Sequence, residues 1–366
     1  MKKILALICS IALVLGLFAA PAAAEAGSPL KILILTSSGV DDGNFNQDCY
    51  EGIKAFLADH PDCTVTDVKE PDLANLVPAL EGLIGEYDVF VLPGFNFSMI
   101  GDIVLANPTK YFMVVDSSIT DAEGNPVTAD NCYTMTYKEE QAGFLAGVAA
   151  AMSSKSGKVA VINGMAFPTN VSYEFGFMSG VTYSNKYFGT NTACVELPSY
   201  AGVDINGQNV GGNYVGSFTD VAAGKTLAEN LIKEGCDVLF AAAGDSGNGV
   251  ITAVKEAEGI WFVGCDVDQY DVGVKGDGNI VLTSALKNMH LSVQRALTAI
   301  YDGTFKGEDA VLGADTDSMG YVSAEGRQQL SEEALAKLQE CYEKLKSGEI
   351  VPASCNGYTP TEFPGL

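Results

Sequence analysis

The chain has 366 residues and a formal net charge of −25, from 21 lysines and arginines against 46 aspartates and glutamates. Such a polyanion repels nucleic acids and anionic membranes, which argues against both as partners. Only Arg295 and Arg327 carry a guanidinium group, the side chain best suited to bidentate recognition of phosphate or carboxylate. The composition therefore favours a small neutral ligand over a nucleotide or an amino acid.

The N-terminus has the three parts of a secretory signal. Lys2 and Lys3 precede an apolar run over residues 4–20, and small residues follow as far as Ala26. We predict a signal peptide over residues 1–26 and a mature protein outside the cytoplasm, in the periplasm or at the cell surface. No later segment has the length and apolarity of a membrane span. A lipid anchor is not indicated, because Ile8, the residue before Cys9, is not small.

Apolar strands and amphipathic helices then alternate along the chain. The first set has predicted strands over 31–36, 64–69, 88–92, 111–116 and 133–137, with helices around 49–57, 73–85 and after 97. The second set has strands over 158–163, 192–197, 237–242 and 260–265, with helices over 139–152, 173–185, 221–234 and 248–256. The tail has a strand over 280–285, a helix over 291–301, a Gly/Asp-rich stretch over 303–320 and a charged helix over 332–346.

This alternation predicts an α/β fold with parallel sheets covered by helices on both faces. Two sets of elements indicate two doubly wound, Rossmann-like lobes. The tail has too few elements for a third domain, so we assign it to the two lobes. The predicted N-terminal lobe is 27–136 with 269–303, and the predicted C-terminal lobe is 137–268 with 304–366.

Candidate ligand-binding residues follow the carboxyl ends of the predicted strands, where open parallel sheets bind ligands. Those ends carry carboxylates, amides, glycines and aromatic rings: Asp42, Asn46, Tyr50, Phe95, Asp116, Gly244 and Asp266. Structural roles compete at several positions. Asn44 and Gln47 fit a capping box on the first helix, and aspartates at strand ends also serve as caps. Phe95 fits a hydrophobic core, and Phe218 fits a hydrophobic staple ahead of a helix.

Signatures of catalysis and of metal binding are weak. His60 and His290 are the two histidines, and neither lies in a motif. Gly244–Gly247 (GDSG) resembles the nucleophile segment of trypsin-like proteases, but here it joins a buried strand to a helix. Eight cysteines follow the signal without a CxxC pair, and most lie in apolar runs typical of buried thiols. We therefore predict a binding protein without a catalytic site, metal or cofactor.

Several segments together resemble the basic membrane protein (BMP) family, the substrate-binding proteins of ABC transporters. The resemblance covers about residues 31–310 and rests on five blocks in the family's order: VDDGNFNQ at 40–47, EQAGFLAG at 140–147, GM at 164–165 with GFMSG at 176–180, GSFTD at 216–220 and GCDVDQ at 264–269. Several family members bind purine nucleosides. The resemblance thus implies a type I periplasmic binding protein, with two lobes joined by three hinge strands and a nucleoside, expected to be a purine, between them.

The resemblance also implies roles for individual residues. Asp42 and Asn46 would bond the base, Phe218 would stack on it, and Asp266 would grip the ribose hydroxyls. Three further residues would complete the shell: Asp116, Gly244 and Lys287. Tyr50 is a candidate for the second stacking face. A neutral nucleoside needs no arginine. The implied partner is the permease of an ABC importer, and we expect a monomer.

Three rival functions remain at this point. The same fold binds neutral sugars or sugar-derived signals in other proteins, and a sensory subunit would present its ligand to a membrane receptor. An enzyme such as a secreted nucleoside hydrolase is the third rival. The dense N-terminal aspartate cluster with which such hydrolases bind calcium is absent from this sequence.

Overall fold

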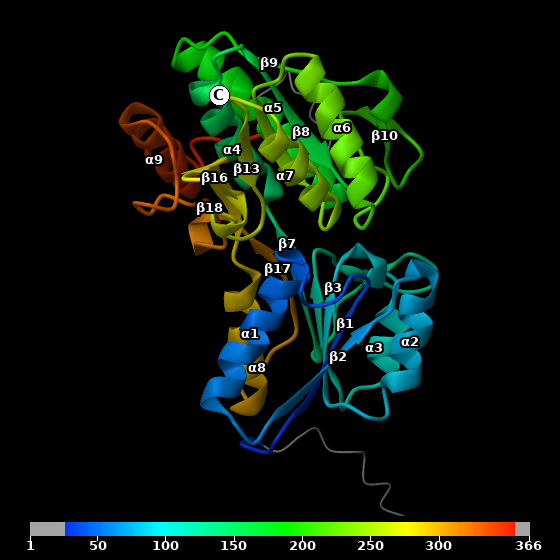
Figure 1. The fold of residues 1–366 in the computed structure, drawn as a ribbon. Helices are drawn as coiled ribbons and strands as arrows, with labels where there is room; N and C mark the ends of the chain where they lie inside the picture. Colours follow the sequence, from blue (N-terminus) through cyan, green and yellow to red (C-terminus); the bar gives the residue numbers. More distant parts are fainter. Residues whose placement is uncertain (1–25, 356–366) are drawn as a thin grey trace, which may run out of the picture.

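The computed structural model describes residues 26–355, so residues 1–25 of the predicted signal and residues 356–366 lie outside it. Within 26–355 the chain forms two lobes, each built on a six-stranded sheet (Figure 1). Helices cover both faces of each sheet. The α/β architecture predicted from the alternation of strands and helices is confirmed.

The sheet of the first lobe is parallel throughout. Its strands lie in the order β17 (Glu308–Leu312), β7 (Cys132–Tyr137), β4 (Tyr111–Val115), β3 (Val89–Pro93), β1 (Lys31–Thr36) and β2 (Thr64–Lys69). Successive residues of a strand point to opposite faces. Ile32 and Ile34 therefore join one core, and Leu33 and Leu35 join the other. A strand buried on both faces reads as the uninterrupted apolar run seen in the sequence.

Two pairs of helices cover this sheet. On one face lie α1 (Phe45–Asp59) and α8 (Met289–Tyr301), which share a core with Ile32 and Ile34. On the other lie α2 (Leu76–Leu83) and α3 (Gly101–Ala106), preceded by the 3₁₀ turns η1 (Leu73–Asn75) and η2 (Phe95–Phe97). Figure 1 shows α1 beside α8, although more than 200 residues separate them in the chain.

The sheet of the second lobe is parallel except at one edge, where β18 runs antiparallel to β16. Its strands lie in the order β18 (Met319–Tyr321), β16 (Val281–Lys287), β13 (Trp261–Gly264), β12 (Val238–Ala242), β8 (Lys158–Asn163) and β9 (Ala193–Cys194). One face packs against α4 (Glu139–Ser153), α5 (Pro168–Tyr187) and α9 (Glu332–Ser347). The other face packs against α6 (Val221–Lys233) and α7 (Ser246–Glu256).

Short elements connect these layers. Three small antiparallel pairs are β5 (Ile119–Thr120) with β6 (Pro126–Val127), β10 (Gly202–Val203) with β11 (Asn209–Gly211), and β14 (Val274–Lys275) with β15 (Gly278–Asn279). Three 3₁₀ turns lie in the second half of the chain: η3 (Pro198–Tyr200), η4 (Asp271–Gly273) and η5 (Ala314–Thr316). Every helix within 26–355 is too short or too polar to span a bilayer.

The chain crosses between the lobes three times, from β7 to α4, from β16 to α8 and from β17 to β18. The lobes observed in the structure differ from the predicted ones, which placed residues 269–303 in the first lobe and residues 304–366 in the second. Strand β16 belongs to the second sheet, through its pairing with β13, and β17 belongs to the first, through its pairing with β7. Apolar periodicity predicts that a strand is buried but not which sheet it joins, so the sequence placed both on the wrong side. The sequence analysis also missed β17 and β18, which lie within and at the end of the Gly/Asp-rich stretch over 303–320.

Candidate functional site

A cleft between the two lobes lies beyond the carboxyl ends of the parallel strands, where this fold class binds ligands. It encloses about 710 Å³ free of protein atoms, part of it open to solvent. Both lobes contribute to its wall, which is formed by Ser37, Ser38, Asp42, Phe45, Asn46, Pro93, Gly94, Asn96, Asp116, Phe167, Thr169, Asn170, Tyr173, Phe218, Ala242, Gly244, Cys265, Asp266 and Lys287. Most of the residues predicted from the sequence meet here: Asp42, Asn46, Asp116, Phe218, Gly244, Asp266 and Lys287.

The carboxylate of Asp42 holds the N-terminus of α1. Its Oδ1 accepts from the backbone N–H groups of Asn44 (3.1 Å) and Gln47 (2.9 Å), and its Oδ2 accepts from that of Asn46 (2.9 Å). Burial raises the pKa of Asp42, although these three donors oppose the shift. The predicted reciprocal capping box between Asn44 and Gln47 does not form. The carboxylate two residues upstream reaches the free amides of the first turn, where negative charge is also favoured by the helix dipole.

Only the first turn of α1 reaches the cleft. Phe45, the first residue of the helix, lines the cleft together with Asn46, whose Nδ2 donates to Ser38 Oγ at 2.7 Å. Tyr50 lies one turn further on, outside the lining, and Lys54 Nζ lies 5.5 Å from its ring centroid. Phe45, which the sequence analysis missed, is therefore the aromatic residue of α1 that lines the cleft, and Tyr50 is not.

The ring of Phe218 lies on two glycines. A β-carbon on Gly164 would overlap the ring, and one on Gly244 would lie 3.0 Å from the Phe218 carbonyl oxygen. Gly244 also has a φ of +55°, which glycine adopts without strain. Phe167 stands 5.8 Å from Phe218 and 5.4 Å from Phe95 between ring centroids. Phe95 thus contacts the second lobe through Phe167 but lies outside the cleft lining.

Two aspartates at the ends of β4 and β13 hold the left-handed backbone conformation that non-glycine residues rarely adopt. Asp116 has a φ of +70° and Asp266 a φ of +66°. Such strain persists only where the surroundings fix it, and it concentrates at functional sites. The hydroxyl of Tyr173 donates to Asp266 Oδ1 at 2.9 Å, and Lys287 N donates to the Asp266 carbonyl at 2.8 Å. Burial raises the pKa of Asp266 to about 6.

Lys287 joins the two lobes electrostatically at the second crossing. Its side chain is 1% exposed, and its Nζ pairs with Asp116 of the first lobe and, at 3.0 Å, with Glu139 Oε1 of the second. Burial opposes its charge, but Asp116, Glu139 and Asp266 outweigh burial and raise the pKa of Lys287 well above its usual value. Burial likewise raises the pKa values of Asp116 and Glu139. The Lys287 ammonium group therefore lies among three buried carboxyl groups, of which Asp116 and Asp266 line the cleft.

The first two turns of α5, with the residue before them, are the main part of the site that sequence reasoning missed. Phe167, Thr169, Asn170 and Tyr173 line the cleft, whereas the sequence placed the start of this helix at Tyr173. Pro168 occupies the first helical position, which is its preferred place in a helix. That signal would have put the helix start, and hence these side chains, at the carboxyl end of β8.

Known proteins are similar to this chain over most of its length. It is 28% identical over 339 residues to the "CD4+ T-cell-stimulating antigen" of Listeria monocytogenes, covering 87% of this chain and 86% of that protein. It is 29% identical over 296 residues to the "ABC transporter nucleoside-binding protein BmpA" of Lactococcus lactis subsp. cremoris, covering 76% and 77%. Each covers more than two thirds of both chains.

The fold is similar to that of solved solute-binding proteins. An ABC transporter solute-binding protein from Aeropyrum pernix superimposes with a TM-score of 0.75 at 23% identity, covering 90% of this chain and 95% of that one. The family model of PnrA-like ABC transporter substrate-binding proteins, named Bmp, matches residues 30–197 and 200–354. The family inferred from the sequence motifs is thereby confirmed. This chain belongs to the Bmp family of PnrA-like ABC transporter substrate-binding proteins.

Proposed function

We propose that this protein binds a nucleoside, preferably a purine nucleoside, in the cleft between its lobes and delivers it to an ABC importer. The observation that supports this most directly is the mixture of side chains that line the cleft. Aromatic rings from both lobes, Phe45 and Phe218, lie in the same lining as amide and carboxylate groups, and Lys287 Nζ lies 5.2 Å from the Phe45 ring centroid. A nucleoside has the matching halves, a flat base and a polyhydroxylated sugar.

The base would lie between Phe45 and Phe218. Base–aromatic stacking contributes about 1–3 kcal/mol per base. Asn46 uses its Nδ2 to donate to Ser38, which leaves its carbonyl oxygen to accept from a base amino group. Asp42 Oδ2 accepts a single backbone bond and so keeps acceptor capacity.

The sugar would lie near Asp266. Within residues 26–355, the hydrogen bonds to its carboxylate are accepted by Oδ1, so Oδ2 is available to two vicinal hydroxyls. Lys287 is the basic side chain among the lining residues, and its charge is already balanced by carboxylates. A phosphate would add negative charge to this acidic site, so we expect a nucleoside to bind more tightly than its nucleotide.

Partner, location and assembly follow from the same role. We propose that the protein acts outside the cytoplasm, that a permease receives the ligand, and that no covalent chemistry occurs on it. Both walls of the cleft come from one chain, so we also propose that the monomer binds the ligand.

Thermal unfolding and calorimetry with a ligand panel test the proposal. The panel contains adenosine, guanosine, inosine, uridine, adenine, AMP, ribose and glucose, each also incubated and checked for turnover. A ligand at a hundredfold its Kd should stabilise the protein by about 2.7 kcal/mol. We expect purine nucleosides to raise the Tm most. Stabilisation by a sugar alone would overturn the nucleoside assignment, and product formation would overturn the binding-only role.

Phe218→Ala tests the stacking contact, with Tyr50→Ala as the matched control outside the cleft. We expect Phe218→Ala to weaken nucleoside binding by about 1–3 kcal/mol. Tyr50→Ala should leave the Kd unchanged. Equal effects of the two substitutions would contradict the proposed position of the base.

A further inference from the structure

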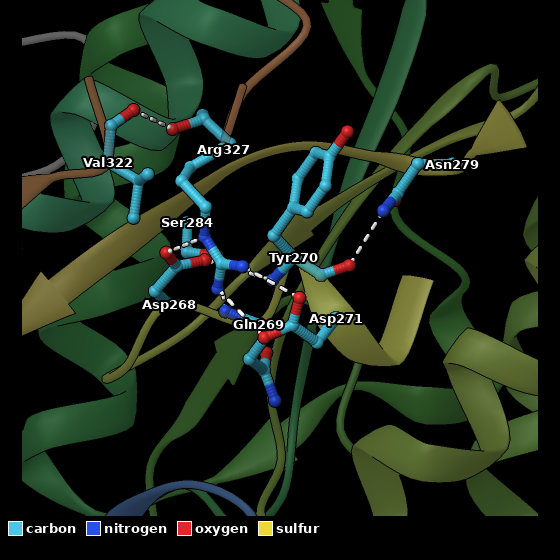
Figure 2. Close-up of polar contacts among 9 residues, drawn as sticks. Asp268, Gln269, Tyr270, Asp271, Asn279, Ser284, Val322 and Arg327 are labelled. Atoms are coloured by element: carbon cyan, nitrogen blue, oxygen red, sulfur yellow. Dashed lines mark hydrogen bonds and ion pairs between the residues drawn. The ribbon is translucent and has the colours of Figure 1, made fainter. Parts of the chain in front are cut away.

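The loop that carries Asp266 is held from two sides. Figure 2 shows the residues that follow Asp266 gathered around the side chain of Arg327. The loop leads from the end of β13 into η4. Because Asp266 holds a left-handed backbone conformation, the contacts that fix the loop also fix the direction of its carboxylate.

The outer side of the loop is held by one guanidinium group. Arg327 Nε donates to Asp268 Oδ2 at 2.7 Å, while Nη1 and Nη2 donate to the two carboxylate oxygens of Asp271 at 2.7 and 3.1 Å. Its Cζ also lies 5.2 Å from the ring centroid of Tyr270 (Figure 2). The planar fork of arginine makes such a double contact, which a lysine ammonium cannot reproduce.

The inner side of the loop is held by Gln269, which is 8% exposed. Its Oε1 accepts from the backbone N–H of Cys265, the residue before Asp266, at 3.0 Å. Its own N–H donates to Ser284 Oγ of β16 at 3.1 Å. Gln269 therefore ties the loop to the residue that follows β13 and to β16.

Arg327 itself comes from a distant segment. This segment follows β18 and lies along β16, where Val322 N donates to the Ser284 carbonyl at 2.9 Å and Gln329 N to the Leu282 carbonyl at 2.8 Å. The same strand thus anchors Gln269 and the segment that carries Arg327. Arg327 is fixed relative to the loop it grips, although 59 positions separate it from Asp268.

The ion pairs of Arg327 are expected to contribute little to the free energy of unfolding. Asp271 is 80% exposed in its side chain and Arg327 is 34% exposed, and exposed ion pairs of this kind contribute little to folding. A binding group, in contrast, needs its direction fixed closely by the residues around it. We propose that Arg327 is a positioning residue that orients Asp266 toward a ligand with two vicinal hydroxyls. This inference rests on the proposed nucleoside function.

The test compares Arg327→Ala with Arg295→Ala, which removes the only other arginine from an exposed position on α8. Binding of adenosine and guanosine is measured beside that of their 2′,3′-dideoxy analogues. We expect Arg327→Ala to weaken binding of each nucleoside about tenfold, equivalent to 1.4 kcal/mol, and to leave the dideoxy analogues unchanged. Arg327→Lys should recover only part of the loss, and Arg295→Ala should change neither affinity.

Hydrogen exchange of the ligand-free protein gives a second readout that does not depend on the ligand's identity. Arg327→Ala should speed exchange over residues 265–271 while the urea midpoint of unfolding stays within error of the wild type. An equal loss for nucleosides and dideoxy analogues, or unchanged exchange over 265–271, would overturn the role of Arg327. The wild-type protein could bind no nucleoside while hydrogen exchange over 265–271 responds to Arg327→Ala as expected. That result would overturn the nucleoside function and the link of Arg327 to vicinal hydroxyls. It would support the role of Arg327 in holding the loop.

Discussion

At the scale of single residues, Asp116 and Asp266 are the most informative side chains of the cleft. They occupy similar positions, one and two residues after a central strand of their own sheets, and both have positive φ values. The lobes thus present two strained carboxylates to the same lysine. Aspartate tolerates this conformation better than most residues because its short polar side chain can bond locally.

Asp266 should make binding dependent on pH. Burial raises its pKa from 3.8 to about 6, and in the proposed complex the ionised carboxylate accepts from the ligand hydroxyls more strongly than the protonated group does. Affinity should therefore reach its full value well above pH 6 and be lost as pH falls through that value. We expect a Kd about tenfold higher at pH 5 than at pH 7.5, measured by calorimetry.

Asp266→Asn is the control for this prediction. It has no proton to gain, so its weaker binding should not change between pH 5 and pH 7.5. A wild-type Kd that is equally flat over this range would show that Asp266 does not contact the ligand as an anion.

At the scale of elements, α1 depends on Asp42 as its cap. Asp42→Ala removes the acceptor of three backbone N–H groups and should cost about 1–2 kcal/mol of unfolding free energy without any ligand. Asp42→Asn keeps one carbonyl acceptor and should lose less. Urea unfolding of the ligand-free proteins measures both. An unchanged midpoint for Asp42→Ala would mean that the cap contributes nothing.

The second element-scale feature is the contact between α4 and α5. A β-carbon on Gly147 would overlap the Phe177 carbonyl oxygen, and one on Gly180 would overlap the Phe144 carbonyl oxygen. The two helix backbones therefore touch at glycines. These glycines belong to the EQAGFLAG and GFMSG segments, so the close approach of α4 and α5 gives both segments a packing role.

Gly147→Ala and Gly82→Ala form a matched pair that tests this contact. Gly147→Ala should destabilise the protein by about 1–3 kcal/mol, because two backbones must move apart. Gly82 lies on α2 with open space around it, and Gly82→Ala should stabilise by about 0.5–1 kcal/mol through helix propensity. Thermal unfolding measures the stability of both variants. Stabilisation by Gly147→Ala would contradict the close approach of the α4 and α5 backbones.

At the scale of the whole molecule, Lys287 lies both at a crossing between the lobes and in the wall of the cleft. It ends β16, directly before the chain crosses to α8, and pairs with carboxylates from both lobes. Ligand closure of a two-lobed protein occurs by rotation about such crossings. The charge cluster therefore lies at a crossing between the lobes as well as in the wall of the cleft.

Lys287→Met should destabilise the whole protein most strongly at high pH. Without the lysine, burial of Asp116, Glu139 and Asp266 is unopposed, so their raised pKa values rise further. The resulting penalty is absent below their ordinary pKa values and grows as pH rises through the raised ones. We expect a loss of about 3–5 kcal/mol at pH 8 and a smaller loss at pH 5, measured by urea unfolding.

Lys54→Met is the control, because Lys54 is half exposed and pairs with Glu51 one turn earlier on the surface of α1. It should cost less than about 0.5 kcal/mol at either pH. A loss from Lys287→Met that did not shrink at pH 5 would contradict the electrostatic account.

The sequence by itself determined the local structure and the family. Apolar runs located most strands, amphipathic periodicity located the helices, and the rule for strand ends selected Asp42, Asn46, Asp116, Gly244 and Asp266. Each of these signals is local, since it depends on residues within a few positions of one another.

Only the tertiary structure decided which lobe each late strand joins, because pairing links residues far apart in the chain. It also placed Phe45 in the cleft lining and Tyr50 outside it, and added Phe167 and Tyr173 from the start of α5, because the packing of each helix decides which of its side chains face the cleft. The grip of Arg327 on the Asp266 loop depends on a third crossing between the lobes. No local pattern predicts such a contact, because it joins segments 59 residues apart in the chain.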